Sequence, residues 1–444
     1  MLGVATGCAL LAAPAARSTG EARTAQRSVL ATKEQLSREA LALRVLASAP
    51  VRQEIARIEQ LYQRDPQGST PTGAATVRRA AGSIALAAVQ YVINGDPARP
   101  AAMWVVNAPH RWFGLDVPGS GYGIDNPDNV YRNIPVGGAS RYEIRGRVMR
   151  PGPVEQHFAL MDSVPGTKPL AVEGGTVLAT LRSDQMAIAP DGSFVITMDS
   201  APANGRPNHL RLPPQGDLLL IVRDLFTDWA TQSLVALEVR RLSGPSMPRP
   251  GVGALATRAA DLLAAIGPYW LAYDNRFIFS KPVNAFNPPR NRPGSRGFST
   301  SGHFSLGPDE ALVVTLDPLG ATSLGVQLTD PWGVAYDYVN RTSSLNNAQA
   351  KRNADGTFTF AISTRDPGFH NWLDPEGFSA GIYAIRWQGL PAGADPKLAV
   401  RNVERVRIDM LRALLPPGAA WLTVEQRRSQ RAERARQYAR RLGR

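Results

Sequence analysis

The chain has 444 residues, which is long enough to bury a large core and suggests two or three structural units. Hydrophobic residues make up 43% and charged residues 20%, as in ordinary globular proteins, and 40 glycines and 36 prolines favour a loop-rich β architecture over a helical bundle. The formal net charge is +13, and the one cysteine, Cys8, excludes an internal disulfide and a cysteine-built metal site.

The N-terminus resembles a signal peptide. Residues 1–18, MLGVATGCALLAAPAARS, form a short apolar run that ends in small residues, although the usual basic start is missing. We predict a signal-like segment over residues 1–20 and export to the periplasm or cell envelope, with lipid attachment to Cys8 as a minor branch. A cytoplasmic protein is the alternative. No other window approaches the ~18 apolar residues of a membrane span, so we expect no transmembrane segment and at most peripheral membrane contact.

Residues 21–75 are predicted to form a helical arm followed by a linker. Thr32 and Gln35 have the spacing of a capping box, and they precede an amphipathic stretch. A second amphipathic helix and a linker over residues 65–73 follow, and an alanine-rich helix is expected over residues 75–93.

Residues 76–250 are predicted to form an N-terminal β-rich part. From residue 102 onward, nine short strand-like runs are separated by Gly, Pro, Asn and Asp at the 8–12 residue spacing of a sandwich or barrel. Alternation places Asn129 and Tyr131 on one face of a strand and Arg132 on the other. In the next run it places the charged residues of the segment 141–145 on one face, where we favour a scaffold role over a site.

A helix and a proline-rich loop are predicted over residues 251–296, a C-terminal β-rich part over 297–402, and helices over 403–444. The first of these last helices is expected at residues 403–414, and a capping box at residues 423–426 begins the second. The predicted fold is therefore mainly β, an antiparallel β-sandwich with an N-terminal helical arm and a C-terminal basic helix.

Much of the positive charge lies in the C-terminal tail. Between Gln426 and Arg444 there are eight arginines against the single acid Glu433. Our leading interpretation is a solvated basic helix, and the second is docking on the protein's own surface or on a subunit partner. Nucleic acid or anionic lipid comes last, because no aromatic interleaving or recognised binding motif accompanies the charge.

Metal and cofactor chemistry finds little support in the sequence. The five histidines are far apart and lack the spacing of ligand pairs, and no G-x-S-x-G, S-x-x-K or Cys/His nucleophile motif is present. Asp125, Asp128 and Asn129 could offer oxygens to calcium, but they fail the EF-hand spacing, and such residues more often form turns. The glycines of residues 119–123 only superficially resemble a phosphate loop. We therefore predict no metal and no cofactor.

The strongest candidate site is the connection between two strand-like runs, TFTFAIS and GIYAIRW, within residues 357–389. Rigid strands that present a polar loop are a common way to build a site. The predicted ligand-binding residues are Tyr338, Asn346, Gln349, Arg365, His370, Asn371, Trp372 and Arg386. Arginines can hold an anion and an indole can stack on a ring of a sugar or lipid. The alternative, ion pairs and core packing at a sandwich corner, has equal weight.

Several segments carry a resemblance to a protein family. DNPDNVYR (125–132), the run over residues 365–374 and the C-terminal WLTVEQRRSQRAERARQYARRLG are similar to the domain-of-unknown-function family 1214, as is SSLNNAQA (343–350). The family usually continues NWLDTAGH, whereas Phe378 replaces that histidine here, so no role of the histidine is carried over. The resemblance covers most of the chain from about residue 80. It implies a bacterial protein with a β-sandwich of jelly-roll type and helical additions, and no particular activity.

Three functions follow as hypotheses. The first is an exported β-sandwich protein that binds a small anionic or amphiphilic, lipid- or sugar-like ligand near residues 365–374. The second is a metal-independent hydrolase or lyase that uses Asp366 or Asp374 as a general base, with Arg365 stabilising an anion. The third is an assembly protein whose helical arm and basic tail hold a homo-oligomer together.

Overall fold

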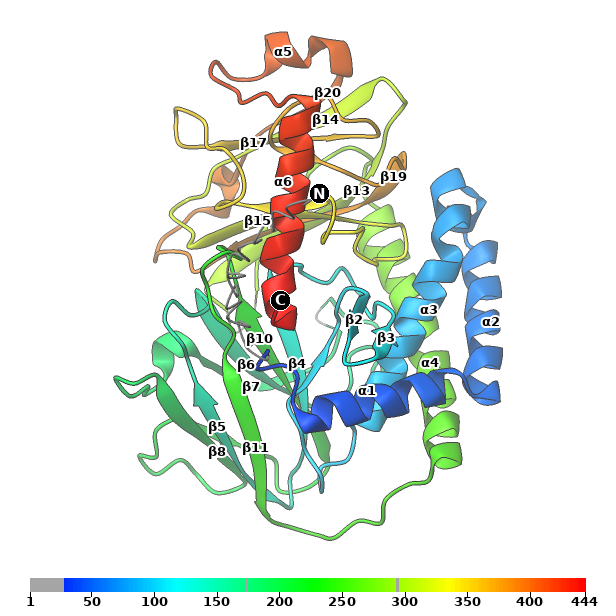
Figure 1. Ribbon diagram of the computed structural model, residues 1–444, viewed down its shortest axis with the longest axis vertical. Helices are drawn as coiled ribbons and strands as arrows, with labels where there is room; N and C mark the ends of the chain where they lie inside the picture. The colour runs from blue at the N-terminus through cyan, green and yellow to red at the C-terminus, as the bar shows by residue number, and fades with distance from the viewer. Residues whose placement is uncertain (1–27, 173, 293–294) are drawn as a thin grey trace, which may run out of the picture.

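The structure is a computed structural model that describes residues 28–172, 174–292 and 295–444. The predicted signal segment and Cys8 lie outside these residues. The described chain contains a helical layer, two β parts stacked along the long axis, and a C-terminal helix that runs along the C-terminal β part and ends at the N-terminal β part (Figure 1). The prediction of a mainly β fold with added helices is confirmed, and most strand pairs are antiparallel.

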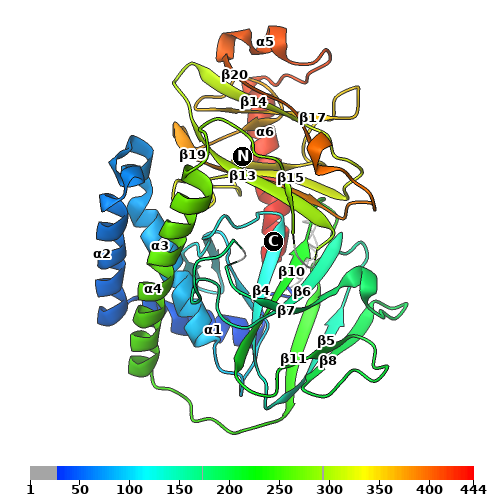
Figure 2. The same ribbon diagram turned by 180° about the vertical axis from the view of Figure 1, so that it is seen from behind.

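The helical layer consists of α1 (Lys33–Leu46), α2 (Ala49–Arg64), α3 (Pro71–Ile93) and α4 (Val252–Asp274). The Thr32 hydroxyl caps α1 by accepting a hydrogen bond from the Gln35 N–H, as the sequence predicts. The Gln35 side chain does not close the capping box, because it pairs with the backbone of Trp104 instead. The alanines of α3 let α2 and α4 pack closely against it, and Figure 2 shows α3 and α4 side by side.

The N-terminal β part has two sheets that face each other. Its strands are β1 (Met103–Val105), β4 (Asn129–Gly137), β5 (Arg141–Arg147), β6 (Glu155–Met161), β7 (Val177–Arg182), β8 (Ser193–Asp199), β9 (His209–Arg211), β10 (Asp217–Leu225) and β11 (Ala236–Ser243). One sheet has the order β1-β4-β10-β6-β7 and the other β11-β5-β8-β9. Apolar side chains of both sheets fill the space between them, so the nine strands predicted here are confirmed.

The C-terminal β part also has two facing sheets. Its strands are β12 (Arg290–Asn291), β13 (Gly297–Ser305), β14 (Glu310–Leu316), β15 (Ser323–Thr329), β16 (Ser344–Asn346), β17 (Phe358–Ser363), β18 (Trp372–Leu373), β19 (Ala380–Gln388) and β20 (Val400–Arg407). The orders are β12-β13-β19-β15-β16 and β18-β17-β14-β20, around one apolar cluster. The two runs TFTFAIS and GIYAIRW are strands, but β17 and β19 lie in opposite sheets. Residues 365–373 stay with the sheet of β17, because β18 pairs with β17, and the chain crosses to the other sheet between Leu373 and Ala380.

The helix predicted over residues 403–414 is wrong in its first half. Residues up to Arg407 continue β20, which pairs with β14, and a 3-10 turn (Ile408–Met410) and the short α5 (Leu411–Leu414) follow. Val403 and Val406 have helical spacing, but they point to opposite faces of the sheet. Val403 packs on the sandwich core, whereas Val406 joins a second cluster with Leu411 on the outer face. Because both faces of β20 are covered by apolar residues, its sequence has apolar residues three apart, which is also the spacing of an amphipathic helix.

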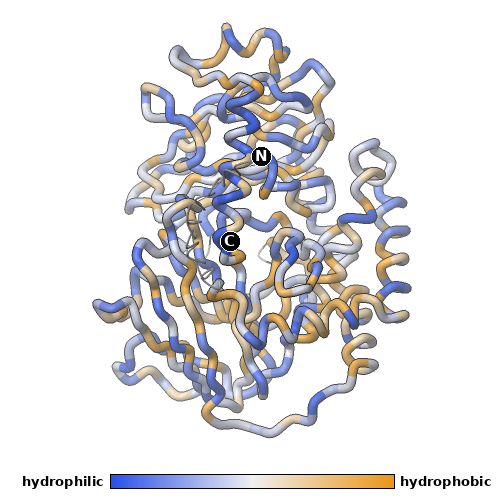
Figure 3. Tube along the Cα trace, viewed as in Figure 1, coloured by the Kyte–Doolittle hydropathy of each residue, from blue (hydrophilic) through white to orange (hydrophobic). Residues whose placement is uncertain are grey.

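The basic C-terminal segment is also different from our leading interpretation. It forms α6 (Val424–Ala439), capped by Thr423 and Gln426 as predicted. The helix is hydrophilic over most of its length (Figure 3), yet two of its arginines and one in the 3-10 turn that follows it, Arg440–Leu442, are buried. Arg427, Arg434 and Arg441 are 4%, 5% and 7% exposed, so α6 docks on the protein's own surface, which was our second interpretation.

Candidate functional site

The predicted site loop forms the platform on which α6 docks. Trp372 is 3% exposed, and its indole N–H donates to the Ser363 carbonyl at 3.1 Å. The guanidinium carbons of Arg427 and Arg431 lie 5.2 and 5.5 Å from the centre of the Trp372 ring. The indole face that we expected to stack on a ligand therefore lies against arginines of the same chain.

Both predicted catalytic carboxylates are held in ion pairs. Asp366 accepts from Nε and Nη2 of Arg427 at 2.8 and 3.1 Å, and Asp374 accepts from Arg431 at 2.8 Å and Arg341 at 3.0 Å. A carboxylate bound by two N–H groups on fixed arginines is a poor acceptor for a substrate proton. This geometry favours a scaffold role for both carboxylates over the predicted role of general base.

The other predicted loop residues also have protein partners. Arg365 pairs with Asp309 on the surface, and fully buried Asn371 bonds the backbone of Lys351 and Thr359. His370 Nδ1–H donates to Asn371 Oδ1 at 3.0 Å, and burial lowers the pKa of His370.

Three further predicted residues contact α6 or the junction of the two β parts. Arg434 donates to the Tyr338 carbonyl at 2.6 Å and to the Gln349 side chain at 3.1 Å. Asn346 donates to Asp128 at 2.7 Å. Of the predicted ligand-binding residues, Arg386 lies apart from this group, and it is the one that lines the cavity described next.

A cavity of about 220 Å³ lies on the outer face of the sheet β1-β4-β10-β6-β7. Strands β4, β10 and β6 form its floor, and α4 covers one end of it through Trp270 and Tyr273. At the other end, Arg386 and Gln388 reach it from β19 of the C-terminal β part. The cavity thus lies where the helical layer and both β parts meet.

The strand register arranges the floor in rows across three strands. The rows are Asn129–Leu225–Glu155, Tyr131–Arg223–His157 and Asn133–Ile221–Ala159. Met161 and Val177 follow as the next pair. Because residues two apart on a strand share a face, the floor changes from polar near the C-terminal β part to apolar towards α4.

Two arginines face the polar end without an acidic partner. Arg386 donates to the Ile124 carbonyl at 2.5 Å and to the Gln327 side chain, and neither Arg386 nor Arg292 forms an ion pair within the described residues. Burial lowers the pKa of Arg386 to about 10, and the positive charge of Arg292 acts in the same direction. Two neighbouring cations at one end of a cavity favour an anion there.

The middle row adds hydrogen-bonding groups. The guanidinium carbon of Arg223 lies 5.9 Å from the Tyr131 ring centre, and its Nη1 lies 3.4 Å from Nδ1 of His157. The Tyr131 hydroxyl accepts from the Asn126 N–H at 3.0 Å, which fixes the ring at the cavity floor. The prediction that Asn129 and Tyr131 share a face is confirmed, and Arg132 lies on the other face, paired with buried Asp224.

Aromatic side chains close the apolar end. The hydroxyl groups of Tyr91 and Tyr122 are 2.5 Å apart, and the Tyr122 ring lies edge-on to Trp270 with centroids 5.6 Å apart. Burial raises the pKa of both tyrosine hydroxyls, so both remain neutral over the usual range of pH. Gly123 has a φ of +61° and contacts the Trp270 ring, where a Cβ would come within 3.1 Å.

Two carboxyl groups also line the cavity. Burial raises the pKa of Asp125 to about 7, against an opposing effect of Arg386, and burial raises the pKa of Glu155. Asp125 is 6% exposed, and its Oδ1 accepts no hydrogen bond from the described residues. The Asx turn expected in this segment is present, since Asn126 Oδ1 accepts from the Asp128 N–H at 3.0 Å.

A second, more open depression lies at the end of β5 and β8. It is lined by Arg141, Asp199 and Arg206. Arg206 donates twice to Asp199, and these bonds lower the pKa of Asp199 to about 2. Its charges compensate each other, as expected for the scaffold role that we assigned to the 141–145 strand.

Two observations limit the chemistry among the described residues. No three histidine, cysteine, aspartate or glutamate side chains there are grouped so that they could hold a metal ion. None of the helices described is long and apolar enough to cross a membrane.

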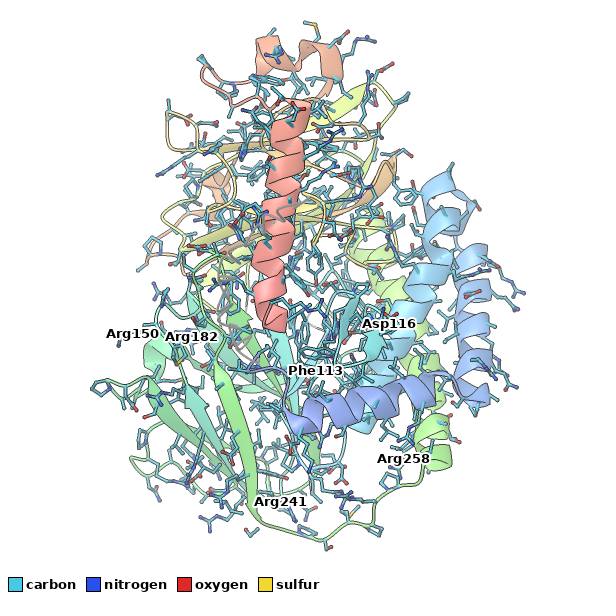
Figure 4. The ribbon with its side chains drawn as sticks, in the orientation of Figure 1. Phe113, Asp116, Arg150, Arg182, Arg241 and Arg258 are labelled. Carbon is cyan, nitrogen blue, oxygen red and sulfur yellow. The ribbon has the colours of Figure 1, made fainter. Side chains whose placement is uncertain are left out.

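Figure 4 labels Arg150, Arg241 and Arg258 near the rim of the molecule, away from α6.

Sequence reasoning missed most of the cavity residues. Arg223 and His157 lie at the polar ends of the runs DLLLIVRDL and EQHFALM, and a polar residue next to an apolar strand segment was the available signal. Nothing in the sequence pairs these two strands at the register that places Arg223 beside His157.

Comparisons with known proteins support the fold and give no activity. No protein-family model matches this chain, and no curated protein matches it. The crystal structure of an uncharacterised protein from Burkholderia cenocepacia is similar, with a TM-score of 0.67 and 25% sequence identity over 83% of this chain and 100% of that chain. The VPA0106 protein from Vibrio parahaemolyticus is more distant, with a TM-score of 0.39 and 12% identity over 64% of this chain and 90% of that chain.

Proposed function

We propose that the protein binds a small amphiphilic molecule with an anionic head group in the cavity on the sheet β1-β4-β10-β6-β7. The observation that carries the proposal is the pair Arg292 and Arg386, two cations that form no ion pair within the described residues, at the polar end of a floor that becomes apolar towards α4. The class of ligand is the one predicted from the sequence, and its place is different from the predicted loop.

The polar end suits a carboxylate or a similar anion. Arg386 keeps N–H groups beyond those bonded to Ile124 and Gln327, since a guanidinium has five. Arg223 and the Tyr131 hydroxyl lie in the adjacent row and can add donors. An anion there would offset the repulsion between Arg292 and Arg386.

The apolar end suits a short hydrocarbon chain. Ile221, Ala159 and Met161 form its floor, and Trp270 covers it. The volume of about 220 Å³ is smaller than the ~300–1,000 Å³ typical of pockets for drug-sized ligands. We therefore propose a single-chain ligand, such as a medium-chain carboxylic acid, in place of a two-chain lipid.

The proposal is tested by titrating the full chain with octanoate and with 1-octanol in a calorimeter. We expect octanoate to bind at least about tenfold more tightly, because hydrogen bonds to charged groups contribute about 1.5–3 kcal/mol. Arg292→Met removes this preference, whereas Arg290→Met, an exposed arginine two residues earlier, leaves it in place. Equal affinity for both compounds, or no binding of either, contradicts the proposal.

A hydrolase is the second candidate, because one observation favours it. Asp125 lines the same cavity with a pKa raised to about 7, so it could exchange a proton near neutral pH. With 4-nitrophenyl octanoate and water, this candidate gives octanoate and 4-nitrophenol at a rate that Asp125→Asn lowers at least about a hundredfold. A rate equal in both proteins excludes Asp125 as the base.

The remaining sequence predictions belong to this proposal. Export to the cell envelope, the jelly-roll type of the sandwich and the relation to the domain-of-unknown-function family 1214 stay predictions. N-terminal sequencing of the protein purified from its cells would test export: a chain that begins near residue 20 supports it, and a chain that begins at Met1 contradicts it.

A further inference from the structure

The turn over residues 125–129 connects the polar end of the cavity to the C-terminal helix. On the cavity side, the Ile124 carbonyl accepts from Arg386, and the Asn126 N–H donates to the Tyr131 hydroxyl. The Gln327 side chain, which also bonds Arg386, donates to the Asp125 carbonyl. The position of this turn therefore helps to fix the positions of the Arg386 and Tyr131 side chains.

On its other side the turn is held by Asp128. This carboxylate is 3% exposed and accepts from the Trp229 indole at 3.0 Å and from Asn346 at 2.7 Å. Its backbone carbonyl also accepts from the Phe226 N–H at 2.8 Å. Asp128 thus joins the turn to β10 of the N-terminal β part and to β16 of the C-terminal β part.

Arginines at the C-terminal end of the chain contact the turn and the Trp229 side chain that bonds Asp128. Arg441 donates to the Pro127 carbonyl at 2.9 Å, inside the turn itself. The guanidinium carbons of Arg434 and Arg441 lie 4.4 and 4.7 Å from the Trp229 ring centre, so both hold the indole that bonds Asp128. The other end of α6 is tied to Asp366 and Asp374 of the C-terminal β part.

We propose that Arg441 and Asp128 are positioning residues for the cavity: α6 and the 3-10 turn that follows it (Arg440–Leu442), neither of which lines the cavity, set the turn that places Arg386 and Tyr131 at its polar end. This inference rests on the proposed function for its binding readout. It predicts that affinity for the anionic ligand depends on a helix that makes no contact with that ligand. The hydrogen bonds of one short turn connect Arg441 to the cavity: Arg441 bonds Pro127, and the neighbouring turn residues bond Tyr131 and Arg386.

The test compares two neighbouring arginines in the full-length protein. Arg441→Met removes the bond to Pro127, whereas Arg440→Met makes the same change of charge at an exposed position. We expect Arg441→Met to weaken octanoate binding about tenfold, as loss of a positioning contact costs about 1.4 kcal/mol. Arg440→Met should stay within about twofold of the unmodified protein. Equal affinities of the two variants overturn the inference.

Two further measurements separate positioning from general instability and from failure of the proposed function. Val314→Ala, in the core of the C-terminal β part, should lower the thermal midpoint without changing octanoate affinity. If it weakens binding as much as Arg441→Met does, positioning is excluded. Hydrogen exchange of residues 124–131 needs no ligand: Arg441→Met should raise it and Arg440→Met should not. Unchanged exchange overturns the inference even if octanoate binds, and raised exchange supports it even if octanoate does not bind.

Discussion

The 365–374 loop and the cavity on β4, β10 and β6 contain the same kinds of side chain, namely arginines, carboxyl groups and aromatic rings. In the loop, each predicted carboxylate is paired with an arginine and the Trp372 ring is covered by two of them. In the cavity, Arg292 and Arg386 have no acidic partner among the described residues, and Asp125 keeps an oxygen without a hydrogen bond. The charges of the 365–374 loop are therefore neutralised by ion pairs within the chain, whereas those of the two cavity arginines are not, and this difference distinguishes the scaffold from the candidate site.

The largest expected effect breaks the scaffold. Trp372→Ala removes a buried indole and two cation–π contacts, so we expect the free energy of unfolding to fall by about 3–5 kcal/mol in urea denaturation. Octanoate affinity of the folded variant should not change. A variant of normal stability that no longer binds octanoate would return the site to this loop.

A smaller effect is expected at one ion pair of the same scaffold. Arg427→Met removes the charged donor from Asp366 and from the Phe369 carbonyl, and it should lower the free energy of unfolding by about 1.5–3 kcal/mol. Its exposed neighbour provides the control, since Arg428→Met should change stability by less than about 0.5 kcal/mol. Similar losses in both variants would show that α6 docks through its net charge alone.

The cavity should reveal itself in the pH dependence of stability. Burial raises the pKa of Asp125 from 3.8 to about 7, so between these values the folded protein holds a proton that the unfolded chain has lost. Stability should therefore decrease as pH rises through this window, by up to about 1.4 kcal/mol per pH unit from this group. In Asp125→Asn this decrease in stability should be smaller, because the Asp125 carboxyl no longer contributes. Part of the decrease should remain, because the pKa of Asp330 is also raised, to about 6. Identical pH profiles would place Asp125 in contact with water.

The smallest expected effect concerns the length of the hydrocarbon chain. Each methylene buried at the apolar end should add about 0.8 kcal/mol, so affinity should rise about fourfold per carbon from butanoate to octanoate. The rise should stop once the chain fills the cavity. Affinity independent of chain length would mean that only the head group is held.

Much of the fold could be predicted from alternation, because each strand has its own pattern. The nine N-terminal strands were found this way, whereas β13 was missed, since its run GFSTSGHFS is rich in glycine and serine. Gly302 is required there because a Cβ would come within 2.1 Å of the Tyr383 hydroxyl. Packing against a partner strand, and not local propensity, makes this segment a strand.

The site could be predicted less well, because it depends on which strands become neighbours. Arg386 was singled out, but it was grouped with Arg365 and Trp372, which lie close in sequence on a connection to the opposite sheet. Tyr131 and Arg223, which line the cavity together with Arg386, come from strands far earlier in the chain. Strand register and inter-sheet contacts therefore decide the cavity, and neither is written in any single segment.

A crystal structure of the complex with octanoate tests the central claim most directly. We expect the carboxylate within hydrogen-bond distance of Arg386 and Arg292, with the chain lying over Ile221 and Ala159 towards Trp270. Octanoate bound beside Trp372, or in the cavity with its carboxylate at the α4 end, would contradict the claim.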